Sequence, residues 1–457
     1  MATAIRSDAV RRVLRRDQTE ERDMTEFGHA HTRNDSEPQP PSSEAESAYA
    51  WTRLFGALVL ATIGGLGLWA VVVALPAVQS EFGVARGDAS LPYTTTAVGF
   101  GLGGILMGRL SDRFGIMTPV IIGAIALALG CAAAASAASL WQFALVQGVL
   151  IGVGVSATFG PLIADTSVWF ARRRGIAVGV IASGNYLAGA LWPPIVQHFI
   201  AATGWRTTYF GIALFCAASM LPLAFVLRRA RPAPRAISGQ VQSDLRSRRS
   251  LGLSSGALQA LLCVAGVACC VAMSMPQVHI VAYCADLGYG PARGAQMLSV
   301  MLGFGILSRL AFGFISDRIG GLRTLLLGSS LQGIALLLFV PFDGLASLYV
   351  ICALFGLFQG GIVPSYAIIV REHFPPAEAG TRVGIVLMAT LFGMALGGWM
   401  SGAIFDWTGS YRAAFANGIA WNLVNVSIAV WLLRRSGIRA KRFREAPHSP
   451  DPVSARK

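Results

Sequence analysis

The chain contains twelve long apolar stretches that carry almost no charge. Each has about 18 residues or more, enough for a helix to cross the ~30 Å hydrocarbon layer of a membrane. They lie near 53–77, 91–110, 118–138, 141–164, 176–199 and 207–228, and then near 254–282, 294–314, 322–341, 346–369, 381–404 and 412–433. Charged residues make up 13% of the chain, whereas a water-soluble surface needs about a quarter. We therefore predict an all-α membrane protein with twelve transmembrane helices.

Two nearly identical peptides lie 205 positions apart, "GRLSDRFG" at Gly108–Gly115 and "GFISDRIG" at Gly313–Gly320. The same offset aligns Gly83 with Gly288, so the whole chain consists of two copies of one unit. A unit with six spans returns the chain to its starting side, and the second copy then enters the membrane in the same orientation as the first. The sequence predicts two parallel six-helix repeats.

Composition divides the chain into five segments. Residues 1–50 are polar with no apolar core, which excludes an N-terminal cleavable signal peptide and predicts a disordered cytoplasmic tail. Residues 51–228 and 254–435 are the two six-helix halves. Residues 229–253 are rich in Arg, Ser and Pro, and we expect a cytoplasmic linker that lets the halves move separately. Residues 436–457 form a second cytoplasmic tail.

The formal charge of +14 lies almost entirely on one side of the predicted spans. The loops of the other side contain Arg86, Arg206, Arg293 and Arg412 and no further Lys or Arg. This asymmetry is the positive-inside bias, so the charge orients the protein and does not indicate a nucleic-acid partner. We expect an integral protein of the bacterial cytoplasmic membrane, embedded in the lipid bilayer with both termini in the cytoplasm.

The sequence lacks the signatures of metal sites and of enzymes. Its seven cysteines lie nearly all in apolar spans without a Cys-x-x-Cys pair, which indicates buried apolar side chains. A Gly-x-x-x-x-Gly-Lys-Ser/Thr loop for ATP is missing, as are His-Glu-x-x-His and Gly-x-Ser-x-Gly. We therefore expect no enzyme activity, no metal and no cofactor, and no ATP bound to this chain.

The repeated peptide lies at the cytoplasmic end of the second span of each copy. Glycine permits close helix approach or a tight turn, and an Asp–Arg pair can face a neighbouring helix terminus or Arg. We predict a cytoplasmic gate that is closed when these pairs form and released when the halves rock. Its residues are Gly108, Asp112, Arg113 and Gly115 in the first copy and Gly313, Asp317, Arg318 and Gly320 in the second.

The peptide Gly-x-Leu-x-Asp-Arg-x-Gly between spans 2 and 3, with a weaker copy between spans 8 and 9, resembles the loop signature of the major facilitator superfamily. The likeness runs roughly from Trp51 to Arg435 and implies the major facilitator fold with alternating access. Within that superfamily, "WFARRRGIAVGVIASG" at Trp169–Gly184 is similar to the span 5 entry of monocarboxylate transporters, with departures at Gly175 and Ile181. This likeness to the monocarboxylate transporter and oxalate:formate antiporter branch implies proton-coupled transport of a small organic monoanion.

Two ionisable residues lie well inside the predicted spans, His279 in span 7 and Arg309 in span 8. Burying a charge in a membrane costs a few kcal/mol, so such residues are candidates for function. The offset places Arg309 on Gly104 and His279 on Ala74, so the repeated fold requires neither. Monocarboxylate transporters carry a span 8 Arg, four residues before a Gly, that pairs with the substrate carboxylate. Arg309 precedes Gly313 by four, and the resemblance gives it this role.

The same relatives often carry an acid one turn before this Arg, where the chain has Gly305. This departure puts a carboxylate proton relay in doubt and leaves His279 as the titrating candidate, because an imidazole changes charge near neutral pH. Two alternatives stay open. Arg309 can instead extend to the headgroups as an anchor, and His279 can be a packing residue.

Further polar residues are candidates for lining a substrate cavity, namely Asn185, Tyr186, Gln359 and Tyr366, while Trp69 and Trp192 are candidates for its apolar walls. The expected partners are a small carboxylate and protons, and we expect the carrier to act as a monomer. The main alternative is a multidrug or hydrophobic-compound exporter of the same superfamily, but the chain lacks the membrane-embedded acid and the span 5 motif expected there. A signalling receptor would carry a long additional cytoplasmic domain.

Overall fold

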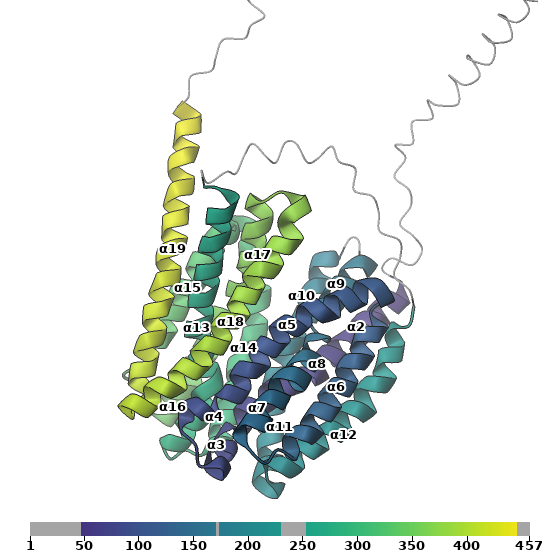
Figure 1. The fold of residues 1–457 in the computed structure, drawn as a ribbon. Helices are drawn as coiled ribbons and strands as arrows, with labels where there is room; N and C mark the ends of the chain where they lie inside the picture. Colours follow the sequence, from purple (N-terminus) through teal and green to yellow (C-terminus); the bar gives the residue numbers. More distant parts are fainter. Residues whose placement is uncertain (1–46, 171–172, 230–252, 446–457) are drawn as a thin grey trace, which may run out of the picture. The chain divides into compact units, whose positions relative to one another are not determined.

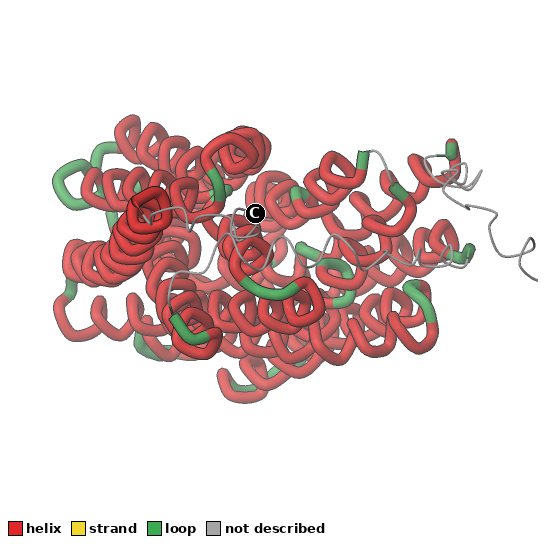
Figure 2. The backbone as a smooth tube through the Cα atoms, turned by 90° about the horizontal axis from the view of Figure 1, so that it is seen from above, coloured by secondary structure: helices red, strands yellow, loops and turns green. Residues whose placement is uncertain are grey.

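The computed structural model describes residues 47–170, 173–229 and 253–445, and every regular element in these ranges is a helix (Figures 1 and 2). The expected tail 1–50 and linker 229–253 fall almost wholly outside the described residues. The expected tail 436–457 starts inside them, and the last helix continues through its first part to Glu445.

The N-terminal half builds the first six spans and is coloured purple to teal in Figure 1. Several of its spans are divided into shorter helices. Its elements are α2 (Ala48–Gly64), α3 (Leu66–Phe82), α4 (Arg86–Ala89), α5 (Leu91–Phe114), α6 (Met117–Ala135), α7 (Leu140–Val146), the π-helical turn η1 (Gln147–Gly152), α8 (Val153–Ser156), α9 (Gly160–Trp169), α10 (Arg174–Ala182), α11 (Gly184–Thr203), α12 (Trp205–Ala224) and the 3-10 turn η2 (Phe225–Leu227).

The C-terminal half builds the last six spans, coloured green to yellow in Figure 1. Five of these spans are single helices, and one is divided. The elements are α13 (Ser255–Asp286), α14 (Pro291–Ile319), α15 (Gly321–Leu338), α16 (Leu345–Gln359), α17 (Ile362–His373), α18 (Pro376–Thr408) and α19 (Tyr411–Glu445).

All twelve predicted spans coincide with helices, and eleven helical segments of the described chain are both long and apolar enough to cross a membrane. The twelfth, α5, has 24 residues with three Thr and five Gly, so its hydropathy is low. At 1.5 Å per residue it is about 36 Å long, which is sufficient to span. Thr96, Gly99, Gly101 and Gly103 are buried where α5 packs on η1, α8 and α18. The low hydropathy of α5 thus reflects contact with other helices.

Glycines with positive φ mark the same three turns in both halves. They are the pairs Gly83 and Gly288 (61° and 81°), Gly115 and Gly320 (79° and 81°), and Gly204 and Gly409 (83° and 65°), which follow the first, second and fifth span of each half. A side chain in this region of φ is strained by about 1–3 kcal/mol, so the backbone itself selects glycine. Because the members of each pair lie 205 residues apart, the backbone confirms the repeat.

Spans 1 and 5 are interrupted, whereas their counterparts in the C-terminal half, α13 and α18, run unbroken for 32 and 33 residues. Span 1 is interrupted at Gly65 and span 5 at Ser183. The interruptions pack together, because a Cβ on Gly65 would lie 2.5 Å from the Cβ of Ala188, and one on Gly184 would lie 2.6 Å from the Cβ of Ala61. Near these interruptions the backbone carbonyls of Thr62 in span 1 and Ala182 in span 5 accept hydrogen bonds from side chains of other helices.

The most extensive contacts between the halves are those of α11 with α14 and of α5 with α18, and α5 and α18 lie side by side in the front of Figure 1. Pro194 lacks an N–H, which frees the carbonyl of Ala190, and the Ser299 hydroxyl of α14 donates to that oxygen. Thr94 of α5 donates to the carbonyl of Ala395 in α18 at 3.1 Å. Polar contacts to backbone carbonyls therefore join the halves on both sides of the central space.

Candidate functional site

A cavity of about 150 Å³ lies between the two halves. The N-terminal half contributes Leu68, Trp69, Tyr93, Ala97, Phe100, Phe159, Asn185 and Tyr186, and the C-terminal half contributes Cys270, Met273, Gln277, Leu302, Arg309, Val363, Leu387, Thr390, Leu391 and Met394. Of these lining residues, Arg309 alone carries a charge. The cavity is therefore an apolar space with one fixed cation and a few neutral polar groups.

Arg309 extends from α14 to the N-terminal half. Its Nη1 donates to the carbonyl oxygen of Ala182 at 2.8 Å, and its guanidinium carbon lies 4.5 Å from the centroid of the Tyr186 ring. The Nε atom is buried and has no hydrogen-bond partner among the described residues. In this conformation the side chain contacts protein across the cavity, so it does not act as an anchor in the headgroups.

The interruption of span 5 explains why the Ala182 carbonyl can accept this bond. Helix α10 ends at Ala182, and the carbonyls of a last helical turn have no donor within their own helix. They also form the negative end of the helix dipole, which attracts a cation. The guanidinium of Arg309 thus donates to a neutral carbonyl that carries the partial negative charge of a helix C-terminus.

Tyr186 occupies the space beside Arg309 where a side chain on Gly305 would project. A Cβ on Gly305 would lie 2.3 Å from Cε1 of Tyr186, far inside van der Waals contact. The bare backbone of α14 at this position leaves room for the ring, whose centroid lies 4.5 Å from the guanidinium carbon. The space that an acidic side chain at position 305 would occupy is therefore filled by the Tyr186 ring from the N-terminal half.

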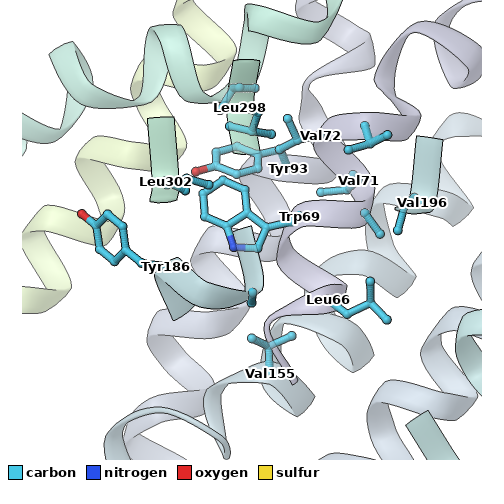
Figure 3. Close-up of a cluster of buried hydrophobic side chains, with 14 of the residues drawn as sticks. Leu66, Trp69, Val71, Val72, Tyr93, Val155, Tyr186, Val196, Leu298 and Leu302 are labelled. Atoms are coloured by element: carbon cyan, nitrogen blue, oxygen red, sulfur yellow. The ribbon is translucent and has the colours of Figure 1, made fainter. Parts of the chain in front are cut away.

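Two tryptophans each donate a hydrogen bond to a backbone carbonyl of the N-terminal half. Trp69 Nε1 donates to the Asn185 carbonyl oxygen at 3.2 Å, and Trp192 Nε1 donates to the Thr62 carbonyl oxygen at 2.7 Å. Figure 3 shows the Trp69 ring beside Tyr93 and Leu302. Trp69 and Asn185 line the cavity, whereas Trp192 is not among its lining residues.

Gln359 lies one hydrogen bond behind the cavity wall. Gln277 lines the cavity, and its Nε2 donates to Oε1 of Gln359 at 2.9 Å. Sequence inspection missed Gln277, although its amide is polar in an otherwise apolar part of span 7. Tyr366 donates to Asn425 Oδ1 at 2.9 Å in the interior of the C-terminal half and does not line the cavity.

His279 lies outside the cavity, fully buried between α13, α18 and α19. Its Nε2 lies 2.7 Å from the carbonyl oxygen of Gly398, so this nitrogen carries the proton and donates. Its Nδ1 lies 3.4 Å from the hydroxyl of Tyr411. This geometry gives no support to the prediction that His279 binds substrate directly. A single polar residue in a span does not reveal which side of the helix it lies on.

Tyr411 connects His279 to a cluster that joins the halves, which we call the Arg86 cluster. Arg86 of α4 binds Asp286 through both Nη atoms at 3.0 and 3.1 Å and donates to Tyr411 at 2.6 Å. Asp406 accepts from the backbone N–H of Arg86 and of Gly87 at 2.8 and 2.7 Å. Burial alone would lower the pKa of Arg86, but Tyr411 and Asp286 hold that pKa above its ordinary value.

The predicted gate residues lie at the C-terminal ends of α5 and α14, on the side of the molecule away from the Arg86 cluster. We call this side the motif face. The side chains of Asp112, Arg113, Asp317 and Arg318 are exposed there. Gly115 and Gly320 make the predicted tight turns. In this conformation a Cβ on Gly108 or Gly313 would meet nothing within 4 Å, so neither glycine contacts another helix here. The positive φ at Gly115 and Gly320 accounts for the last glycine of each motif copy.

The described residues contain no group of three or more His, Cys, Asp or Glu side chains that could hold a metal ion. The seven cysteines are unpaired, and six of them are buried. What the cavity offers chemically is therefore a guanidinium, two amides, hydroxyl groups and a large apolar surface.

Comparison with known proteins agrees with this architecture. The family model of the Major Facilitator Superfamily matches residues 57–352 and 262–457. Monocarboxylate transporter 13 from Bos taurus is 29% identical over 331 residues, covering 71% of this chain and 75% of that protein. The Agnestins efflux protein AgnL12 of Paecilomyces divaricatus is 23% identical over 339 residues, covering 74% and 76%. The crystal structure of the nucleoside transporter NupG has a TM-score of 0.67 at 14% identity, covers 83% of this chain and 99% of that one, and shares the fold. The chain is thus an integral membrane protein that belongs to the Major Facilitator Superfamily, a family of transporters and not of enzymes.

Proposed function

We propose that this transporter carries a small organic monoanion, a monocarboxylate, and that Arg309 binds its carboxylate. The observation that carries the proposal is the unpaired Nε of Arg309 in a cavity lined by no other charge. Arg309 is half-buried and has no acidic residue beside it in the cavity lining, so a carboxylate that enters the cavity supplies the missing counterion.

A substrate carboxylate can replace the present hydrogen-bond acceptor of Arg309. The Ala182 carbonyl is a neutral acceptor, and a carboxylate accepts two parallel bonds from a guanidinium that are about twice as strong as neutral ones. Tyr186 covers one face of the guanidinium and leaves its edge for the anion. One fixed charge fits one carboxylate, which favours a monoanion over a dianion.

Alternating access requires one gate on each side of this cavity. The Arg86 cluster joins the halves in the present conformation, and we assign it to the outer gate. The exposed Asp–Arg pairs of the motif face belong to the cytoplasmic gate, which closes when the halves rock together at that face. The positive-inside bias supports this orientation, with both termini cytoplasmic. The relatives named above come from a mammal and a fungus and so do not favour the expected bacterial membrane.

Proton coupling is assigned to His279 through the outer gate, not through direct substrate contact. Neutral His279 accepts from Tyr411, whose oxygen in turn accepts from Arg86. A second proton on the imidazole would turn the acceptor Nδ1 into a donor and place a cation near Arg86. The cluster would then lose one hydrogen bond and gain a repulsion, which favours opening of this gate.

Export of a hydrophobic compound is the second candidate function. It is favoured by the apolar lining of the cavity and by the likeness to AgnL12, whose name describes an efflux protein. Such a carrier would accept neutral ligands and would tolerate loss of Arg309.

Substrate uptake into proteoliposomes separates the two candidates. Arg309→Lys keeps the charge but loses the two-pronged geometry, and it should abolish most transport of labelled monocarboxylates. The loss of a buried charge-assisted pair corresponds to about 2–5 kcal/mol of binding. Arg293→Lys is the matched control, since Arg293 is exposed and bonds Gln296. Near wild-type affinity in Arg309→Lys, or competition by esters and amides equal to that of the acids, would refute the monocarboxylate proposal.

A further inference from the structure

The cavity is much larger than a carboxylate, so most of its space is left for the remainder of the substrate. Its volume is about 150 Å³, the size at which an apolar protein cavity holds a benzene molecule. Acetate or another two-carbon acid would leave most of this space empty. An unfilled apolar space forfeits contacts that a substrate with a larger body would make.

The cavity is also long in one direction. Along α14 it extends from Arg309 to Leu302, and along α18 from Leu387 to Met394. Each of these pairs is seven residues apart, which is about 10 Å along a helix axis at 1.5 Å per residue. Since the single charge lies at one end of this length, a substrate held by Arg309 places its body toward the other end.

The walls near that body are aromatic and thioether side chains. Trp69 and Phe100 line the cavity from the N-terminal half, and Met273 and Met394 line it from the C-terminal half. Aromatic rings pack against each other edge-to-face or offset, and sulfur atoms contact ring edges favourably. Trp69 is held in place by its bond to the Asn185 carbonyl, so it forms a preformed wall.

From the volume, the length and these walls, we infer that the substrate is an aromatic monocarboxylate, with one ring joined to the carboxyl group directly or by a short chain. This inference rests on the proposed function and adds the class of substrate. The ring lies between Trp69, Phe100 and the two methionines, and the carboxylate lies on the free edge of Arg309.

Equilibrium binding to the purified transporter tests the inference, with radiolabelled phenylacetate and acetate as ligands and phenylacetamide as a neutral competitor. Phenylacetate should bind at least about tenfold more tightly than acetate. Phenylacetamide should compete poorly, and Arg309→Lys should lose phenylacetate binding. Tighter binding of acetate that still depends on Arg309 would overturn the aromatic class and leave the monocarboxylate proposal intact. Equal binding of phenylacetamide that is unaffected by Arg309→Lys would overturn both, as would binding of neither acid.

Two variants test the size of the cavity in opposite directions. Ala97→Leu adds a side chain to the lining and should weaken phenylacetate binding at least about tenfold relative to acetate. Val98→Leu, on the exposed side of the same helix, should change the binding of neither phenylacetate nor acetate and is the matched control. Met394→Ala enlarges the cavity and should increase binding of the bulkier naphthylacetate. This gain keeps the test decisive even if Ala97→Leu fails to fold, and its absence would contradict the placement of the ring.

Discussion

Replacing Asp286 by Asn should shift the carrier toward the conformation that is open at the Arg86 cluster. Asp286 binds both Nη atoms of Arg86, at 3.0 and 3.1 Å, and this ion pair joins α13 to α4 across the two halves. The pair exists only while the halves are in contact at this face. Its loss therefore destabilises one conformation and leaves the other unchanged.

The size of the shift follows from the geometry of the pair. A hydrogen bond to a charged group contributes about 1.5–3 kcal/mol. The Asp286 side chain is 34% exposed, so solvent screening reduces this contribution, and the amide oxygen of Asn still accepts one bond. We expect a loss of about 1–2 kcal/mol, which is roughly a 5- to 30-fold change in the equilibrium between the two conformations.

Thiol labelling measures this shift. Thr94 bonds the Ala395 carbonyl across the halves and is half-buried, so Thr94→Cys reports opening in a protein whose native cysteines are replaced. A membrane-impermeant reagent should label it about 5–30-fold faster with Asp286→Asn. Asp343→Asn is the control, because Asp343 pairs with Arg412 on the same face but within one half. Equal labelling rates in the two variants would refute the reasoning.

Three further predictions concern the gates and the turns. Gly115→Ala should lower the free energy of unfolding by about 1–3 kcal/mol because its φ is +79°, whereas Gly108→Ala, with open space around the added Cβ, should not; equal losses in thermal unfolding would contradict this. His279→Gln should retain counterflow exchange and lose accumulation driven by a proton gradient, and normal accumulation would make His279 a packing residue. Asp112→Asn should favour opening at the motif face and slow transport more than it changes affinity, which unchanged labelling of cavity positions from that face would disprove.

The fold could be predicted from sequence because its determinants are local and repeated. Apolar runs of membrane-spanning length predicted all twelve spans, including α5, whose low hydropathy comes from residues buried against other helices. The offset of 205 aligns the glycines of each pair in the sequence, and a tight turn was predicted for the pair within the repeated peptide, Gly115 and Gly320. The interruption of span 5 at Ser183 was not predicted, because no proline or glycine pair distinguishes it from an ordinary helical turn.

The site was predicted less completely because it depends on the direction in which side chains point. Arg309 was identifiable as a charge in hydrocarbon without a twin in the other half. Asn185 and Tyr186 were correctly expected at the cavity, but the sequence could not show that the Tyr186 ring fills the place beside Gly305. His279 and Gln277 lie two residues apart on α13, yet one faces the Arg86 cluster and the other the cavity. The helical period of 3.6 residues places such neighbours on different faces of the helix. The composition of the span does not show which of these faces lines the cavity.

The glycine at the position equivalent to Arg309 in the first repeat has a consequence for how carriers of this kind diversify. Gly104 is the twin of Arg309 under the repeat, lies one turn beyond the lining residue Phe100, and has nothing within 4 Å of where its Cβ would be. A side chain can therefore be introduced there without repacking the helices. A single base change converts a glycine codon to an arginine codon, so a second cation can arise at this position in one substitution. Acquired binding of a dicarboxylate such as phenylmalonate by Gly104→Arg would reproduce that step, and failure of the folded variant to bind any dianion would show that the second position does not reach the substrate.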